Sequence, residues 1–158
     1  MNSPAGADST FHPTARRIAA SFARQAIMET LGASLVRVAP GEVEIALAVS
    51  PSVSQQHGFV HAGAVATIAD SAAGYAALTT MPEGRGVLTA EFKINLLAPA
   101  AGERLVAIGR VVKAGRTLTI AQAEVFAEAK AGDAVTRKPC ALLTATLMAV
   151  ENRAGVVD

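Results

Sequence analysis

Alternating apolar and polar residues in the second half of the chain predict a series of long β-strands. The clearest run is 87–97, where one set of side chains, Leu88, Ala90, Phe92, Ile94 and Leu96, lies opposite a polar set, Thr89, Glu91, Lys93 and Asn95. Runs over 104–113 and 117–129, joined by the short loop 114–116, predict a hairpin. A last strand is expected over 140–150, with Pro139 at its start or at a sheet edge because proline cannot donate to a neighbouring strand.

The first half combines helical periodicity with two short strands. Apolar residues at helical spacing predict a helix over 15–31, with Thr14 as its N-terminal cap and Gly32 at its end. Strands are expected over 34–38 and 43–49, and Pro40-Gly41 between them predicts a hairpin turn. Residues 1–13 have the composition of a disordered tail, and residues 151–158 are expected to form a second tail. A single domain therefore covers 14–150.

Residues 57–80 form the stretch around which the rest of the chain is organised. A Gly-containing turn leads into a predicted helix over 62–80, in which eight of nineteen residues are alanine. Val65, Ile68, Ala72 and Tyr75 follow the spacing of a core stripe. One long helix followed by a run of strands favours an α+β fold, and about six strands against one helix indicate an antiparallel sheet that curls around it.

Composition and charge narrow the function classes. Hydrophobic residues make up 51% of the 158-residue chain and charged residues 17%, which is more apolar than a typical soluble monomer and predicts oligomer interfaces. The net charge of +1 and the absence of tryptophan argue against a nucleic-acid partner. One cysteine, no signal-peptide pattern and no apolar run of membrane-spanning length predict a cytoplasmic protein without membrane association.

The predicted helix carries one carboxylate, Asp70, among small neighbours. The helix start near His61, Ala62 and Gly63 offers unpaired N–H groups and a partial positive charge, which suit an anion or a polarised carbonyl oxygen. Asp70 lies about 10 Å further along the axis, too far to act on a group held at its own helix start. Either a substrate spans this gap, or Asp70 of one subunit serves the helix start of another.

Plainer interpretations of these residues stay open at this point. A lone Asp on an alanine-rich helix is most often a solvated surface residue, and a His before a helix most often holds a loop. Ser71 has no His partner and no G-x-S-x-G elbow is present, so a serine nucleophile is not indicated. We expect no metal site, because His57 and His61 bracket a Gly-Phe-Val loop without an accompanying Glu.

The run HGFVHAGAVATIADSAAGYAA resembles the signature of hotdog-fold acyl-CoA thioesterases of the phenylacetate-degradation (PaaI) type. That signature is a His-Gly-Gly turn, a long helix and an Asp nine residues after the His, here His61, Ala62, Gly63 and Asp70. The segments VLTAEFKINLLAPAAGERL and VVKAGRTL also resemble strands of that family. The resemblance covers roughly residues 32–150 and implies a curved antiparallel sheet wrapped around one helix. It also implies a homodimer, often paired into a homotetramer, with active sites at the subunit interface.

The resemblance further implies hydrolysis of an acyl-CoA thioester, with coenzyme A as part of the substrate and no separate cofactor. The Ala62 N–H would polarise the thioester carbonyl, and Asp70 of the opposite subunit would act as base or nucleophile. Gln55 would orient the water, and Thr89 corresponds to a hydroxyl near the start of the third strand. The remaining expected substrate contacts are His61, Gly63, Gly115, Arg116 and Thr117, with Arg116 as a phosphate contact.

Two positions depart from the family pattern, because Ala62 replaces the usual first Gly and Gln55 stands where Asn is more usual. Both keep the chemical group that the mechanism needs. Two other functions stay open: a module that binds acyl-CoA without catalysis, and a hotdog enoyl-CoA hydratase or dehydratase that would use His57 or His61.

Overall fold

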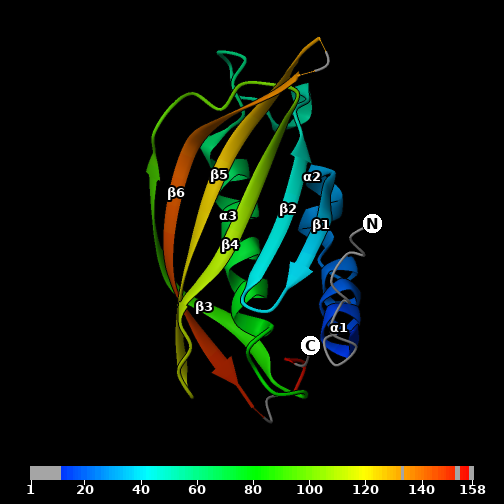
Figure 1. Ribbon diagram of the computed structural model, residues 1–158, viewed down its shortest axis with the longest axis vertical. Coiled ribbons are helices and arrows are strands. Elements are labelled where there is room, and N and C mark those ends of the chain that lie inside the picture. Colours follow the sequence, from blue (N-terminus) through cyan, green and yellow to red (C-terminus); the bar gives the residue numbers. More distant parts are fainter. Residues whose placement is uncertain (1–11, 133, 152–153, 157–158) are drawn as a thin grey trace, which may run out of the picture.

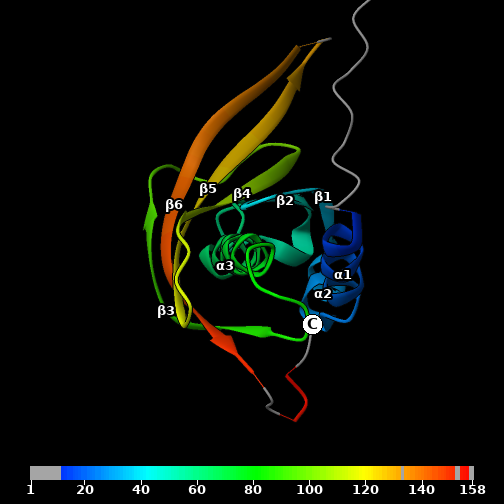
Figure 2. The ribbon, with the colours of Figure 1, turned by 60° about the horizontal axis from the view of Figure 1, so that its bottom comes forward.

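The computed structural model describes residues 12–132, 134–151 and 154–156. In chain order the elements are α1 (His12–Ala23), α2 (Ala26–Leu31), β1 (Ala33–Ala39), β2 (Glu42–Ala48), the 3-10 turn η1 (Pro51–Val53), α3 (Ala62–Leu78), β3 (Gly86–Leu96), β4 (Arg104–Lys113), β5 (Leu118–Ala131) and β6 (Ala134–Val150). The strands form one antiparallel sheet in the order β1-β2-β4-β5-β6-β3 (Figure 1). Figure 2 shows the sheet curling around α3, with α1 and α2 on the remaining side. The expected α+β fold is confirmed.

The core lies between α3 and the concave face of the sheet. Twelve of the 17 residues of α3 are buried, including the predicted stripe Val65, Ile68, Ala72 and Tyr75. The helix is central because its many alanines leave room for the sheet on several sides. At the closest approach, a Cβ placed on Gly109 of β4 would lie 2.2 Å from the backbone oxygen of Ala72.

This contact predicts that Gly109 is required for stability. In Gly109→Ala the new methyl group would meet helix backbone that no side-chain rotation can move, so we expect a loss of about 3 kcal/mol or more. For a chain of this size that corresponds to a fall in melting temperature of roughly 6–12 °C. Gly74→Ala is the matched control, because a Cβ there meets nothing within 4 Å and alanine gains about 1 kcal/mol over glycine in a helix. Thermal unfolding of both variants checks the expectation, and a wild-type melting temperature for Gly109→Ala would contradict it.

The predicted N-terminal helix is two helices. The first begins at His12, so Thr14 lies inside it and is not its cap. It ends in tight turns in which the N–H groups of Arg24 and Gln25 donate to backbone carbonyls three residues earlier, both at 3.0 Å. In one straight helix Ile18 and Met28 would lie on different faces, whereas the break lets both be buried. Residues 1–11 of the predicted tail lie outside the described residues.

The last strand begins six residues before the predicted start. Pro139 is inside β6, where it pairs with Phe126 of β5 beside a register shift. Its other side has no neighbouring strand, because β3 ends at Leu96 opposite Ala141. The expectation of a strand start at Pro139 is wrong, but the expectation of a sheet edge is correct. The missing N–H costs no ladder bond on that open side.

The edge strand β3 contains an irregularity that changes which side chains face the helix. Its register with β6 shifts between Thr89 and Glu91, so Ala90 is an extra residue. Thr89 and Phe92 consequently both lie opposite buried residues of β6, Leu147 and Ala145. The simple alternation predicted from the sequence, with Thr89 on the face opposite Phe92, is wrong.

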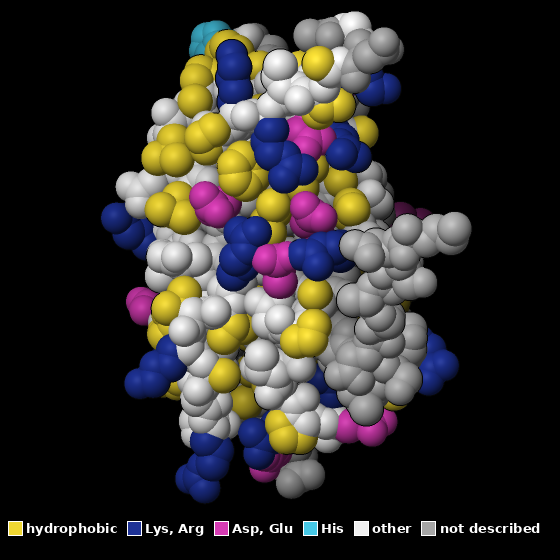
Figure 3. Space-filling model, in the orientation of Figure 1, with side chains coloured by type: hydrophobic (Ala, Val, Ile, Leu, Met, Phe, Trp, Pro, Cys, Tyr) yellow, Lys and Arg dark blue, Asp and Glu magenta, His cyan; other side chains and the backbone are white. Residues whose placement is uncertain are grey.

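The convex face of the sheet carries paired charges. Figure 3 shows basic and acidic side chains gathered across the middle of this face. Glu42 lies between Arg37 and Arg110, and the buried Glu128 accepts from Arg104 at 2.5 Å and from Arg137 at 2.7 Å. Burial raises the pKa of Glu128, but the two arginines outweigh this effect and the net pKa of Glu128 is lowered.

Across the described residues, none of the helices has the length and apolar character needed to span a membrane.

Candidate active site

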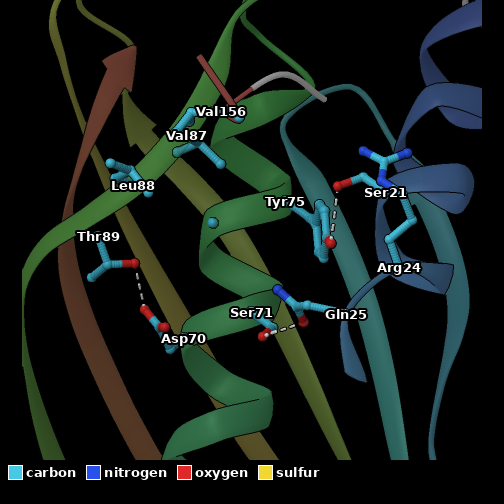
Figure 4. A pocket seen from close by; sticks show the side chains of 12 residues that line it. Ser21, Arg24, Gln25, Asp70, Ser71, Tyr75, Val87, Leu88, Thr89 and Val156 are labelled. Carbon is cyan, nitrogen blue, oxygen red and sulfur yellow. Dashed lines mark hydrogen bonds between the residues drawn. The ribbon is translucent and has the colours of Figure 1, made fainter. Parts of the chain in front are cut away.

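Asp70 points from α3 toward β3, where its carboxylate meets a single hydroxyl. The Thr89 hydroxyl donates to Asp70 Oδ1 at 2.8 Å (Figure 4). The extra residue Ala90 makes this contact possible, since it places Thr89 on the helix-facing side of the strand. Burial raises the pKa of the Asp70 carboxyl above its usual value, and the hydrogen bond from Thr89 lowers it in part. Asp70 is therefore not the solvated surface acid of the plainer interpretation.

A cavity of about 340 Å³ opens beside this carboxylate. Its walls come from the joint between α1 and α2, from the middle of α3 and from the start of β3, and residues 155–156 also line it. Val156 packs closely on β3, because a Cβ at Gly86 would lie 2.7 Å from its Cγ1. The volume is that of a small-molecule site.

The start of α3 leaves one backbone donor without a partner. His61 is the N-cap residue: its Nδ1 accepts from the Gly63 N–H at 2.9 Å, and its carbonyl accepts from the N–H groups of Ala64 and Val65. Among the described residues, the Ala62 N–H has no hydrogen-bond acceptor. It is exposed at the positive end of a 17-residue helix. An oxygen that gains negative charge would be stabilised there.

Gln55 lies in the loop that precedes this helix. Its N–H donates to the Phe59 carbonyl at 2.8 Å and its side-chain oxygen accepts from the His57 N–H, so the loop closes on itself. Gln55 and Ala62 line one cavity of about 620 Å³. The structure thus places Gln55 at the same cavity as the start of α3. The histidine ring and the Gly63 N–H are already engaged with each other.

The two cavities share none of the residues that line them. Asp70 and Thr89 belong to one, and Ala62, His61 and Gln55 belong to the other. Ala62 and Asp70 are eight positions apart on α3, or about 12 Å along the axis. Within one chain, Ala62 and Asp70 therefore line separate cavities.

The predicted coenzyme A contacts form a third, separate hollow. Arg116 and Thr117 line it together with Arg85, which donates to the Arg116 carbonyl at 3.2 Å. Gly115 sits tightly in this hairpin loop, because a Cβ there would lie 2.3 Å from the Leu118 carbonyl oxygen. Within the described residues, no three His, Cys, Asp or Glu side chains converge as a metal-binding group.

Sequence reasoning missed the polar wall of the Asp70 cavity, which includes Ser21, Arg24, Gln25, Ser71 and Tyr75. Ser71 donates to Gln25 Oε1 at 3.2 Å, and the hydroxyls of Ser21 and Tyr75 lie 3.2 Å apart (Figure 4). Ser71 and Tyr75 are four residues apart on α3, a spacing that could have linked them. Gln25 carries no such signal, because it stands at a helix break that neither Gly nor Pro marks.

Several known proteins are similar to this chain in sequence and in fold. The family model of the thioesterase superfamily matches residues 57–132. A crystal structure of a thioesterase family protein from Silicibacter pomeroyi is 47% identical, with a TM-score of 0.84 over 88% of this chain and 99% of the other. A Halobacterium salinarum protein whose name calls it an esterase is 29% identical over 68% of this chain and 74% of its own. The E. coli PaaI protein of the phenylacetic acid degradation operon shares the fold, with 21% identity and a TM-score of 0.75 over 94% of this chain and 99% of its own.

Proposed function

The chain belongs to the thioesterase superfamily as a hotdog-fold thioester hydrolase, and on that premise we propose that it hydrolyses acyl-coenzyme A thioesters with Asp70 as its catalytic carboxylate. The observation that carries this proposal is the position of Asp70, half-buried and hydrogen-bonded by Thr89 at the wall of a cavity. Active-site carboxylates are often kept in such partly desolvated places, because the raised pKa makes them better bases.

The reaction would use the two half-sites together. The thioester carbonyl oxygen would accept from the Ala62 N–H, and Asp70 would take a proton from a water that attacks the carbonyl carbon. The negative charge would collect on the oxygen held by Ala62, and the C–S bond would then break. The proton on Asp70 would pass to the leaving sulfur, which gives a carboxylic acid and coenzyme A. Attack by Asp70 itself, through an anhydride that water then opens, uses the same geometry.

The other expected residues would support these two groups. Gln55 shares the cavity of Ala62 and would hold the water, while Thr89 would orient the carboxylate. His61 and Gly63 would act indirectly, since their mutual hydrogen bond shapes the helix start. At the hairpin loop, we assign Arg116 to the phosphates of coenzyme A, with Gly115 and Thr117 shaping the loop.

A homodimer would bring the half-sites together, and pairs of dimers would form a tetramer. β3 is an edge strand of 11 residues, so its outer backbone groups can pair with a second copy. Phe92 and Leu96 on this strand, and Leu97 just after it, are 46–57% exposed in the single chain, which supports an interface there. The single buried thiol, Cys140, fits a reducing compartment such as the cytoplasm.

An acyl-CoA panel tests this function. The purified protein is incubated with aromatic, medium-chain and branched acyl-CoAs, and release of the free thiol is followed. We expect thiol release from at least one of these classes. We expect no hydration of crotonyl-CoA, a reaction that would instead indicate a hydratase. Saturable binding without thiol release at high enzyme concentration would instead indicate a binding module and overturn the proposal.

The raised pKa of Asp70 predicts the pH profile of the hydrolysis. The reaction needs the ionised carboxylate, so kcat/KM should fall on the acid side, with a midpoint above the usual pKa of an aspartate. Thr89→Val removes the hydrogen bond that lowers this pKa, so the midpoint should move to still higher pH. Profiles of both proteins, measured with one acyl-CoA, check the direction. A shift toward lower pH in the variant would contradict the role given to Thr89.

A further inference from the structure

The cavity beside Asp70 has a polar wall that hydrolysis does not require. Two side-chain pairs line it: Ser71 with Gln25 and Ser21 with Tyr75, each at 3.2 Å. Ser21, Ser71 and Tyr75 are all buried. The hydrogen bonds within the pairs offset the cost of burying these groups, and the pairs give this side of the cavity a polar surface.

The first pair leaves a hydrogen-bond donor facing the cavity. The Ser71 hydroxyl donates to the side-chain oxygen of Gln25 at 3.2 Å, and the NH2 group is the other end of this amide. Within the described residues, that NH2 group donates to no other group. Figure 4 shows it turned toward the side of the cavity on which Asp70 lies. Gln25 can therefore donate to an oxygen of a molecule bound there.

Space for such a molecule lies over Gly74. This glycine is buried, yet a Cβ placed on it would meet no atom within 4 Å apart from its own stretch of helix backbone. It stands one helical turn after Asp70 and next to Tyr75. Val87 and Leu88 of β3 line the same cavity. A group that extends from Asp70 across Gly74 would have an apolar side and a polar side.

We propose that Gln25, held by Ser71, selects acyl groups that carry a neutral oxygen substituent such as a hydroxyl, with Ser21 and Tyr75 extending the polar wall. The inference rests on the proposed function, since it assigns the cavity to the acyl part of the substrate. A neutral substituent fits better than a carboxylate, because the exposed Arg24 and the Asp70 carboxylate, which both line the cavity, leave it without net charge. An acyl group without the oxygen would cover the Gln25 donor and leave it unpaired, which disfavours it.

The test compares acyl-CoAs that differ by one hydroxyl. The pairs are hexanoyl-CoA with 6-hydroxyhexanoyl-CoA, and 3-phenylpropanoyl-CoA with its ring-hydroxylated form. The readout is the kcat/KM of the hydroxylated substrate divided by that of its unsubstituted match. We expect a ratio of about 10 or more for the wild type in at least one pair. This ratio should fall toward about 1 in Gln25→Leu and should decrease in Ser71→Ala. Both changes should come mainly from a lower kcat/KM for the hydroxylated substrate.

Ser34→Ala is the matched control, because this exposed serine of β1 is absent from the cavity wall, and it should keep the wild-type ratio. Gly74→Val fills the free space and should slow hydrolysis of both members of a pair. An unchanged ratio in Gln25→Leu, an equal fall with both substrates, or full activity of Gly74→Val would overturn the inference.

A binding measurement separates this inference from the proposed function. Non-hydrolysable thioether analogues of the same pairs are titrated into the wild type and Gln25→Leu by calorimetry. If no acyl-CoA is hydrolysed but the hydroxyl preference in binding depends on Gln25, the proposed function fails and the selection by this cavity stands. If hydrolysis occurs and neither rate nor binding responds to Gln25, the inference alone fails.

Discussion

Asp70→Asn is expected to lower kcat by roughly 10³-fold, since a positioned base typically contributes 10²–10⁴-fold. The amide keeps the size of the side chain and can still accept from the Thr89 hydroxyl. It can neither take a proton from water nor attack a thioester. Substrate binding should change little, so KM should stay close to the wild-type value. Thiol release with the best acyl-CoA of the panel measures both constants.

The stability of this variant provides the control. Burial raises the pKa of Asp70 in the folded chain, so the folded state binds its proton more tightly than the unfolded state does. Loss of that proton above the raised pKa therefore costs stability at neutral pH, and a neutral Asn removes the cost. We expect Asp70→Asn to melt at the same temperature as the wild type or higher. An active Asn variant would remove Asp70 from the mechanism.

Ala62→Pro is expected to lower kcat by about 10²–10³-fold, the usual loss when one oxyanion donor is removed. Ala62 is the first helical residue, a position where proline is well tolerated because its N–H is outside the helical ladder. His61 already has the extended conformation that a residue before proline prefers, with φ −62° and ψ 138°. The substitution thus deletes the donor while the helix keeps its start.

Ala62→Gly is the comparison, since it keeps the N–H and restores the residue usual in the family pattern. It should hydrolyse at least as fast as the wild type, because glycine has no Cβ beside this N–H and leaves more room for the thioester carbonyl. Circular dichroism should show equal helix content in all three proteins. Wild-type turnover by Ala62→Pro would show that the oxyanion is held elsewhere.

The same two variants test whether the site is shared between subunits. If Asp70 and Ala62 of one site come from different chains, a heterodimer of the two inactive variants has one doubly damaged site and one intact site. Random exchange makes about half of the dimers mixed, so roughly a quarter of the wild-type activity should return. Recovery should be absent if each chain contains a complete site.

The strands and the central helix could be predicted because their patterns are regular. Alternation over β2 places Ile45 in the core, and helical spacing does the same for Ile68. The separation of Ala62 from Asp70 also follows from the sequence, since helix geometry alone sets that distance. Similarity to known proteins identifies the family, whereas the roles of individual residues stay predictions.

The features that escaped prediction are all departures from regular geometry. The extra residue Ala90 moves Thr89 to the side of Asp70, and no glycine or proline marks it. The break before Gln25 depends on burial of Met28 against the rest of the fold, which a local pattern does not encode. The early start of β6 depends on pairing with β5, which the local sequence does not show. Pro139 therefore does not mark the start of the strand.

The joint between α1 and α2 has a consequence for how such a protein can change over time. Asp70 and Ala62 lie on α3 and Thr89 lies on β3, whereas Gln25 stands between α1 and α2, outside the sheet and its central helix. Among the described residues, no side chain caps the start of α2. Replacements at this joint can therefore alter which molecules are accepted while the reaction machinery stays intact. Related proteins could acquire a different substrate specificity through substitution of a few residues in this N-terminal segment.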